Sequence, residues 1–254
     1  MGVAIRTADE GDRELVVRLL DEAFQDDPVS GWVFPGDEYR RSTHHRLMAA
    51  FTEIVLAEGR IDVTEDESAC ALWLPVPAEE HEQHEQHEQH EQHEQHEQHE
   101  QHEQHEQHEQ HEQHEQHEQH EQHEQHEQHK QHEDHEAYAA ADDGPARLRD
   151  AIDPGNERIE LIGRLTAEIH PAGRAHEYLW MIGVTPQLQG AGIGTALVRP
   201  VLDRCDREGL PAYLEASNAR SRALYERLGF ELAGRPLDLP DGPRMWPMWR
   251  EPRG

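Results

Sequence analysis

Apolar residues recur along this chain with two periods, one typical of helices and one typical of strands. Spacings of three and four residues, as at Leu15, Leu19 and Leu20, are typical of a helix with one buried face. Such spacings predict a first helix that ends at residues 26–28 and further helices at 37–57, 146–152, 157–169, 195–207 and 220–228. Short apolar or alternating runs predict strands at 3–6, 60–64, 69–74, 178–184, 212–215, 230–232 and 244–249. A loop with large aromatic residues is predicted at 31–36.

Between residues 79 and 136 the apolar pattern stops, because the chain there is almost wholly His, Glu and Gln. The triplet His-Glu-Gln recurs in 16 perfect copies. A period of three does not match 3.6 residues per turn, so no apolar stripe forms, and a solvated helix and a disordered arm are both consistent with it. We expect three segments: 1–78 as one half of a domain, 79–136 as an insertion in a surface loop, and 137–254 as the other half.

The repeat dominates the charge of the chain. Outside it, 22 basic and 33 acidic residues remain, a net charge of −11 in place of −31. This sign argues against nucleic acid and against a membrane as partners. The 19 histidines of the segment predict weak binding of divalent metals, but without the fixed geometry of a catalytic or structural site.

The two cysteines, Cys70 and Cys205, are expected to be free thiols, because two are too few for a disulfide scaffold. The chain shows no signal-peptide pattern and no apolar run of membrane-spanning length. These observations predict a cytoplasmic protein. We expect a monomer or a homodimer.

A glycine-rich turn, Gln189 to Gly194, stands between the strand at 178–184 and the helix at 195–207. Glycines at alternate positions let a ligand approach the backbone, and the helix N-terminus presents free N–H groups, so the turn predicts an anion site suited to a phosphate or pyrophosphate. A P-loop is excluded because Thr195-Ala196 follows Gly194. A dinucleotide site stays open: Thr195 replaces its third glycine, but Glu215 imitates its ribose-binding acid. A purely structural turn also stays open.

Two motifs around this turn give the chain a family resemblance. The first, Gln/Arg-x-x-Gly-x-Gly/Ala, is met by Gln189, Gly192 and Gly194, and the second by Asn218, Tyr225 and Gly229-Phe230. Both, in this order and at this separation, resemble the GNAT superfamily of N-acetyltransferases. Residues 208–215, 225–230 and 241–246 look like the branch that includes puromycin N-acetyltransferase, although that branch often has Asn where Ser221 stands.

The resemblance implies an α/β (α+β) fold. It would have a mixed, mostly antiparallel sheet of about six to seven strands with a central splay between two parallel strands, flanked by helices. The repeat would fall in a loop. The parallel pair would be the strands at 178–184 and 212–215, if the helix between them is a right-handed crossover.

The resemblance also implies acetyl-CoA as co-substrate. Its pyrophosphate would lie on the turn, and its pantetheine would add like a strand beside Ile182 and Val184, steadied by Asn218. The cofactor-binding residues expected on this basis are Ile182, Val184, Gln189, Gly190, Ala191, Gly192, Ile193, Gly194, Thr195 and Asn218. No metal ligands are expected.

Two catalytic residues are expected. By resemblance Tyr225 is the acid that protonates the leaving thiolate, and the alternative is a tyrosine that only packs in its helix. Glu215 is our candidate for the base that removes the ammonium proton, with Glu177 and His176 as alternatives. Trp32 and Phe34 either cap the core or line the substrate pocket.

The expected function is N-acetyl transfer to a primary amine of a small molecule, with an antibiotic such as puromycin indicated by resemblance. Two other classes stay open: an acyl-CoA sensor without turnover, and a metal-binding or storage protein that acts through its histidines.

Overall fold

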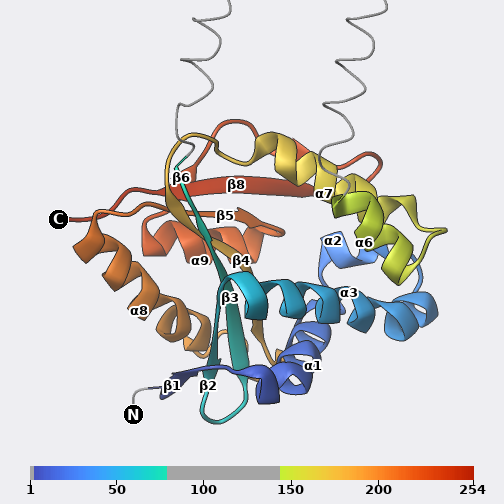
Figure 1. Cartoon of the computed structure of the whole chain (residues 1–254), viewed down its shortest axis with the longest axis horizontal. Coiled ribbons are helices and arrows are strands. Elements are labelled where there is room, and N and C mark those ends of the chain that lie inside the picture. The colour runs from blue at the N-terminus through green and yellow to red at the C-terminus, as the bar shows by residue number, and fades with distance from the viewer. Residues whose placement is uncertain (1–2, 79–143) are drawn as a thin grey trace, which may run out of the picture. The chain divides into compact units, whose positions relative to one another are not determined.

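Residues 3–78 and 144–254 are described by the computed structural model (Figure 1). The predictions made for the segment 79–136 lie outside the described residues. The helices are α1 (Arg13–Phe24), α2 (Pro28–Val33), α3 (Asp37–Glu58), α6 (Gly144–Ile152), α7 (Glu157–Ile169), α8 (Ile193–Glu208) and α9 (Ala219–Leu228), with 3-10 turns η1 (Glu10–Asp12) and η2 (Pro186–Leu188). The strands are β1 (Ile5–Thr7), β2 (Arg60–Thr64), β3 (Ala69–Val76), β4 (His176–Val184), β5 (Ala212–Ala216), β6 (Glu231–Leu232), β7 (Leu237–Asp238) and β8 (Arg244–Arg250).

The predicted helices and strands are confirmed in their order and lie close to their predicted bounds. The loop predicted at 31–36 is wrong over its first half, because α2 extends through Val33. The Asp27-Pro28 pair, predicted to end the first helix, starts the next one, and α1 already ends at Phe24. Asp27 caps α2 by accepting a hydrogen bond from the N–H of Val29 at 2.9 Å, and Pro28 occupies the first helical position.

The strands form one eight-stranded sheet in the order β1-β2-β3-β4-β5-β8-β6, and β7 pairs with β8. The mixed, mostly antiparallel sheet is confirmed, with β4 and β5 as its parallel pair. The strand count is higher than the expected six to seven because β7 is only two residues long and carries little pattern of its own.

The two parallel strands separate soon after they meet. Their pairing consists of Glu177 with Ala212 and Tyr178 with Tyr213, whereas β4 continues to Val184. On its other side β4 remains paired with β3 up to Val184. Beyond Tyr178, therefore, one edge of β4 faces a gap in the sheet.

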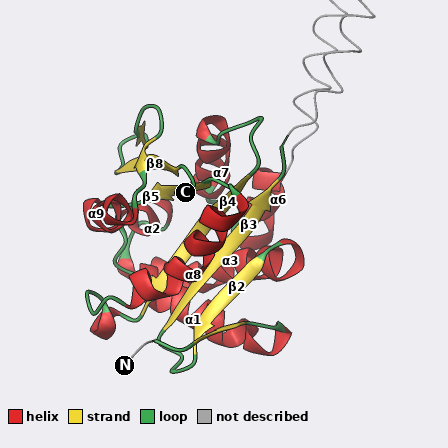
Figure 2. Ribbon diagram, turned by 90° about the vertical axis from the view of Figure 1, so that its left-hand side faces the viewer, coloured by secondary structure: helices red, strands yellow, loops and turns green. Residues whose placement is uncertain are grey.

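Helices cover both faces of the sheet, and each face has its own apolar core (Figure 2). One core packs α1, α2, α3 and α7 against β2 and β3. The other packs α8 and α9 against β3, β5 and β8. Cys70 and Cys205 are buried free thiols, one in each core, as predicted.

Candidate active site

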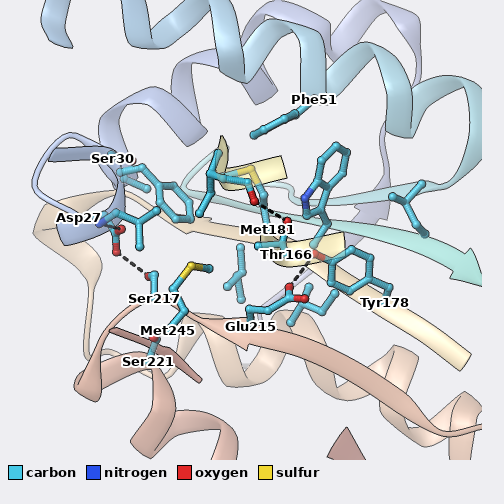
Figure 3. A pocket seen from close by; sticks show the side chains of 18 of the residues that line it. Asp27, Ser30, Phe51, Thr166, Tyr178, Met181, Glu215, Ser217, Ser221 and Met245 are labelled. Carbon is cyan, nitrogen blue, oxygen red and sulfur yellow. Dashed lines mark hydrogen bonds between the residues drawn. The ribbon is translucent and has the colours of Figure 1, made fainter. Parts of the chain in front are cut away.

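A cavity of about 1160 Å³ opens where β4 and β5 separate. It is lined by residues of α1, α2, α3, α6, α7 and α9, of β4, and of the glycine turn before α8. Figure 3 shows some of the lining side chains. This volume slightly exceeds the usual range for ligand pockets, which is about 300–1,000 Å³. The cavity is therefore large enough for two ligands side by side.

The glycine turn forms one end of this cavity. Gly190 and Gly192 have φ angles of 85° and 86°, a left-handed conformation that other residues adopt only with strain. Gly192 is the N-cap of α8 and offers no side chain to the helix, so the first N–H groups of α8 are open to a ligand. The helix dipole adds positive potential at the same place. The turn therefore has the geometry of an anion site.

Arg220 adds a positive charge beside this turn. Its Nη1 donates to Gln189 Oε1 at 3.2 Å, and Gln189 Nε2 donates to the carbonyl of Val184 at 3.2 Å. Arg220 also lines the cavity. The sequence analysis did not predict this residue. Its position two residues after Asn218 nevertheless places a cation at the start of α9, within reach of the glycine turn before α8.

The exposed edge of β4 forms the floor between this turn and the sheet. Ile182 and Val184 line the cavity from the part of β4 that β5 has left. A strand edge without a ladder partner presents N–H and C=O groups that an extended ligand can pair with. Of the predicted cofactor-binding residues, all line the cavity except Ala191.

The Asn218 side chain is engaged within the fold. Its Oδ1 accepts from the N–H of Ser221 at 2.9 Å and so caps α9, and its Nδ2 donates to Asp27 Oδ2 at 3.0 Å. Ser217 Oγ donates to the same carboxylate oxygen at 2.6 Å. The predicted contact of Asn218 with pantetheine would therefore have to compete with two existing hydrogen bonds.

Tyr225 lies near this network, on the α9 wall of the cavity. Its side chain is 5% exposed and packs edge-on against Phe230, with ring centroids 5.9 Å apart. Burial, and then the negative charge of Asp27, raise the pKa of Tyr225 above its ordinary value. The phenol therefore stays protonated at neutral pH, as an acid must before it acts.

Glu215 approaches the cavity from the end of β5. Its Oε2 accepts a hydrogen bond from the Tyr178 hydroxyl at 2.6 Å (Figure 3). Its Oε1 is buried and, among the described residues, has no hydrogen-bond partner. A buried carboxylate oxygen without a partner is costly unless a ligand or a proton satisfies it.

The two alternative bases lie away from the cavity lining. Glu177 accepts from Arg204 Nη2 at 2.6 Å, and its pKa is raised by burial against the opposing effect of Arg204. His176 is buried, with its Nδ1 on the carbonyl of Arg174 at 2.8 Å. Of the three, Glu215 is the one that reaches the cavity.

Trp32 and Phe34 have separate positions. Trp32 is buried in the core, donates from Nε1 to the carbonyl of Pro240 at 2.8 Å, and is not part of the cavity wall. Phe34 is fully buried and also lines the cavity. Beside the cavity, Phe51 packs on Trp180 with ring centroids 4.4 Å apart. This half of the cavity is therefore aromatic and apolar.

The fold and the cavity define an α/β protein whose ligand site combines a helix N-terminus, a free strand edge and a protonated tyrosine. The sequence model of the Acetyltransferase (GNAT) family matches residues 67–230 of this chain. The chain belongs to this family.

Curated relatives match over shorter stretches. A protein of Schizosaccharomyces pombe named uncharacterized N-acetyltransferase C550.08 is 37% identical over 76 residues, which are 30% of this chain and 31% of that protein. The mycothiol acetyltransferase of Streptomyces coelicolor is 39% identical over 74 residues, 28% of this chain and 24% of that protein. The matched segment thus spans about a third or less of these relatives.

Two solved structures share the fold. A structure described as histone acetyltransferase HPA2 and related acetyltransferase from Corynebacterium glutamicum has a TM-score of 0.59 at 21% identity, covering 100% of this chain and 98% of that one. Arylalkylamine N-acetyltransferase 2 from Aedes aegypti has a TM-score of 0.57 at 11% identity, covering 99% of each chain. At these identities the likeness shows the fold alone.

Two features of the described residues bear on other functions. Within residues 3–78 and 144–254, no helix is both long and apolar enough to cross a membrane. The same part of the chain contains no group of three or more His, Cys, Asp or Glu side chains arranged to hold a metal ion.

Proposed function

We propose that this protein transfers an acetyl group from acetyl-CoA to the primary amine of a small molecule, by direct attack in a ternary complex. The observation that carries this proposal is that the N-terminus of α8 and the buried phenol of Tyr225 open into the same cavity. An anion site suits the pyrophosphate of an acyl-CoA, and a protonated acid suits its thioester. These two groups lie at opposite ends of the pantetheine part of the molecule.

Binding of acetyl-CoA would use the features already described. The N–H groups at the start of α8, with Arg220 beside them, would hold the pyrophosphate. The edge of β4 at Ile182 and Val184 would pair with the amides of pantetheine in the gap between the parallel strands. This arrangement leaves the aromatic half of the cavity for the amine.

The chemistry then needs a base and an acid. Glu215 Oε1 would take a proton from the acceptor ammonium, so that the neutral amine can attack the thioester carbon. As the C–S bond breaks, Tyr225 would give its proton to the departing thiolate. The proton that the attacking nitrogen must lose to become an amide would then go to the Tyr225 phenolate, whose raised pKa makes it a ready acceptor, and this returns the tyrosine to its starting state.

The acceptor half of the cavity favours an amine with an apolar or aromatic body. Phe34, Phe51 and Trp180 supply flat surfaces there, and Met181 and Met245 supply adaptable ones (Figure 3). An antibiotic of the puromycin type has this character, and the sequence resemblance to that branch points the same way. We therefore place aromatic amines first among the acceptors to be tested.

The experiment is an assay of CoA release with a panel of antibiotics, polyamines, arylalkylamines and peptide N-termini. With the best acceptor, Tyr225→Phe should lower kcat by roughly 100-fold or more and change acetyl-CoA binding by less than about threefold. Tyr39→Phe is the matched control, because Tyr39 is outside the cavity and its hydroxyl contacts Asp153. Equal losses of turnover and acetyl-CoA binding in Tyr225→Phe would contradict the acid role.

The same assay separates the proposal from a sensor. A sensor would bind acetyl-CoA and release no CoA with any amine. Release that depends on the amine, and a product whose mass has increased by one acetyl group, would support the transferase.

A further inference from the structure

A cluster of four side chains that the proposed chemistry does not use lies next to Glu215. Its members are His170, His176, Tyr178 and Tyr213. Tyr178 donates to Glu215 Oε2 at 2.6 Å, and His170 Nδ1 lies 3.9 Å from Glu215 Oε1. His170 follows the C-terminus of α7, lines the cavity, and packs edge-on against Tyr178 and Tyr213 with centroid distances of 4.8 and 4.9 Å. His176 lies behind it, with its Nε2 at 3.1 Å from His170 Nε2.

The hydrogen bonds determine which ring nitrogens carry protons. The Arg174 carbonyl can only accept, so the His176 Nδ1 atom at 2.8 Å from it carries the hydrogen. In the neutral ring, His176 Nε2 then has a lone pair and accepts from His170 Nε2–H. A neutral His170 consequently has its lone pair on Nδ1, the atom that faces Glu215 Oε1.

We propose that His170 accepts, through Nδ1, the proton that Glu215 takes from the acceptor ammonium, and passes it to solvent. This relay rests on the proposed acetyl transfer. In the first step an ammonium N–H bond breaks and an O–H bond forms on Glu215 Oε1. In the second step that O–H bond breaks and an N–H bond forms on His170 Nδ1. The resulting imidazolium loses its Nδ1 proton to water and keeps its Nε2–H on His176, so both side chains return to their starting states.

The geometry suits a transfer that follows the arrival of a proton. At 3.9 Å the Nδ1 and Oε1 atoms are about 1 Å beyond hydrogen-bond distance, so a small rotation of either side chain brings them together. The His170 side chain is 23% exposed and that of Glu215 4% exposed, so the histidine is the one with access to water. His170 therefore acts through Glu215 and need not touch the acceptor.

Titratable neighbours on each adjoining element support these proton positions. On β4, burial lowers the pKa of His176 and raises that of Tyr178. On β5, burial and then the charge of Glu215 raise the pKa of Tyr213. His176 is therefore neutral at neutral pH and both phenols keep their protons, which leaves Glu215 and His170 as the pair that exchanges a proton.

The relay is tested in the full-length protein with His170→Gln, which removes the titratable ring and keeps a polar side chain. At neutral pH kcat should fall on the order of 10-fold or more, with KM for acetyl-CoA unchanged. The pH profile of kcat/KM should change, because the proton acceptor behind Glu215 is gone. Added imidazole should restore turnover to His170→Ala. The matched control is His45→Gln, an exposed histidine of α3 outside the cavity.

A double-mutant cycle separates relay from packing. If the two residues pass one proton, Glu215→Gln with His170→Gln should be no slower than Glu215→Gln alone. Additive losses would overturn the relay, and so would an unchanged pH profile in His170→Gln. Both outcomes would contradict the relay but would still be compatible with acetyl transfer by the wild-type protein. A wild-type protein without turnover on any amine would overturn the proposed function and the relay with it.

Discussion

Two glycines of the α8 N-terminus, only two residues apart, should respond in opposite ways to the same substitution. Gly192 has a φ of 86°, and a Cβ there would meet no atom within 4 Å, so Gly192→Ala adds backbone strain without a clash. Gly194 is in the helix, and a Cβ there would meet Ile182, Leu224 and Val184 at 3.5–3.8 Å, which is ordinary contact. The three contacted side chains all line the cavity.

These positions set the sign and size of each effect. Gly192→Ala should lower the free energy of unfolding by about 1–2 kcal/mol, the cost of a left-handed conformation in a residue with a Cβ. Gly194→Ala should raise it by about 0.5–1 kcal/mol, because alanine loses less entropy in a helix. The new methyl group of Gly194→Ala would nevertheless lie on the α8 face that pantetheine approaches in the proposed complex. A crowding cost of about 1.4 kcal/mol there corresponds to about tenfold weaker acetyl-CoA binding.

The assay pairs thermal unfolding with calorimetric titration of acetyl-CoA. A domain of this size should shift its Tm by about 2–4 °C per kcal/mol, downward for Gly192→Ala and upward for Gly194→Ala. The reasoning is refuted if Gly194→Ala destabilises the fold as Gly192→Ala does. It is also refuted if the more stable Gly194→Ala protein binds acetyl-CoA as tightly as the wild type.

The remaining predictions concern pH and the repeat. Because burial lowers the pKa of His176 below that of the unfolded chain, the unfolded state takes up a proton first, and stability should fall as pH drops below about 6.5. Each pH unit by which the pKa of His176 is lowered contributes about 1.4 kcal/mol to the free energy of unfolding. Between pH 7.5 and pH 5, the free energy of unfolding measured in urea should therefore fall less in His176→Gln than in the wild type. An equal fall in both proteins would contradict this. Deletion of residues 79–136 should leave amine-dependent CoA release within about threefold of the full chain, because every residue assigned a role lies outside that segment. A folded deletion protein without activity would show that the repeat takes part in the function.

Local sequence rules predicted the elements but not all of their boundaries. The Asp27-Pro28 pair was interpreted as the end of a helix, although the same two residues also satisfy the N-cap and first-turn requirements of α2. β7 was not predicted because a strand of two residues is too short to show an alternation of apolar and polar residues. It is formed by its pairing with β8. Short elements depend on their partners.

The site was predictable to the extent that its motifs were contiguous. Gln189, Gly192, Gly194 and Tyr225 were named from the sequence, and the structure places all four on one cavity. Arg220 and His170 were missed, since the role proposed for each rests on a distance, from Arg220 to Gln189 and from His170 to Glu215. Neither distance belongs to a pattern along the chain.

The sequence alone determined a strand, a glycine turn and a helix whose N-terminus has the geometry of an anion site, because backbone conformation and helix polarity are local properties. It also determined the family, because the two motifs are short and ordered. Only the tertiary structure decided that Asn218 is hydrogen-bonded to Asp27 and that Trp32 lies away from the cavity. It also decided that one Glu215 oxygen faces His170 and has no hydrogen-bond partner within residues 3–78 and 144–254. Burial and hydrogen-bond partners arise when distant segments pack together, so these properties are decided only in three dimensions.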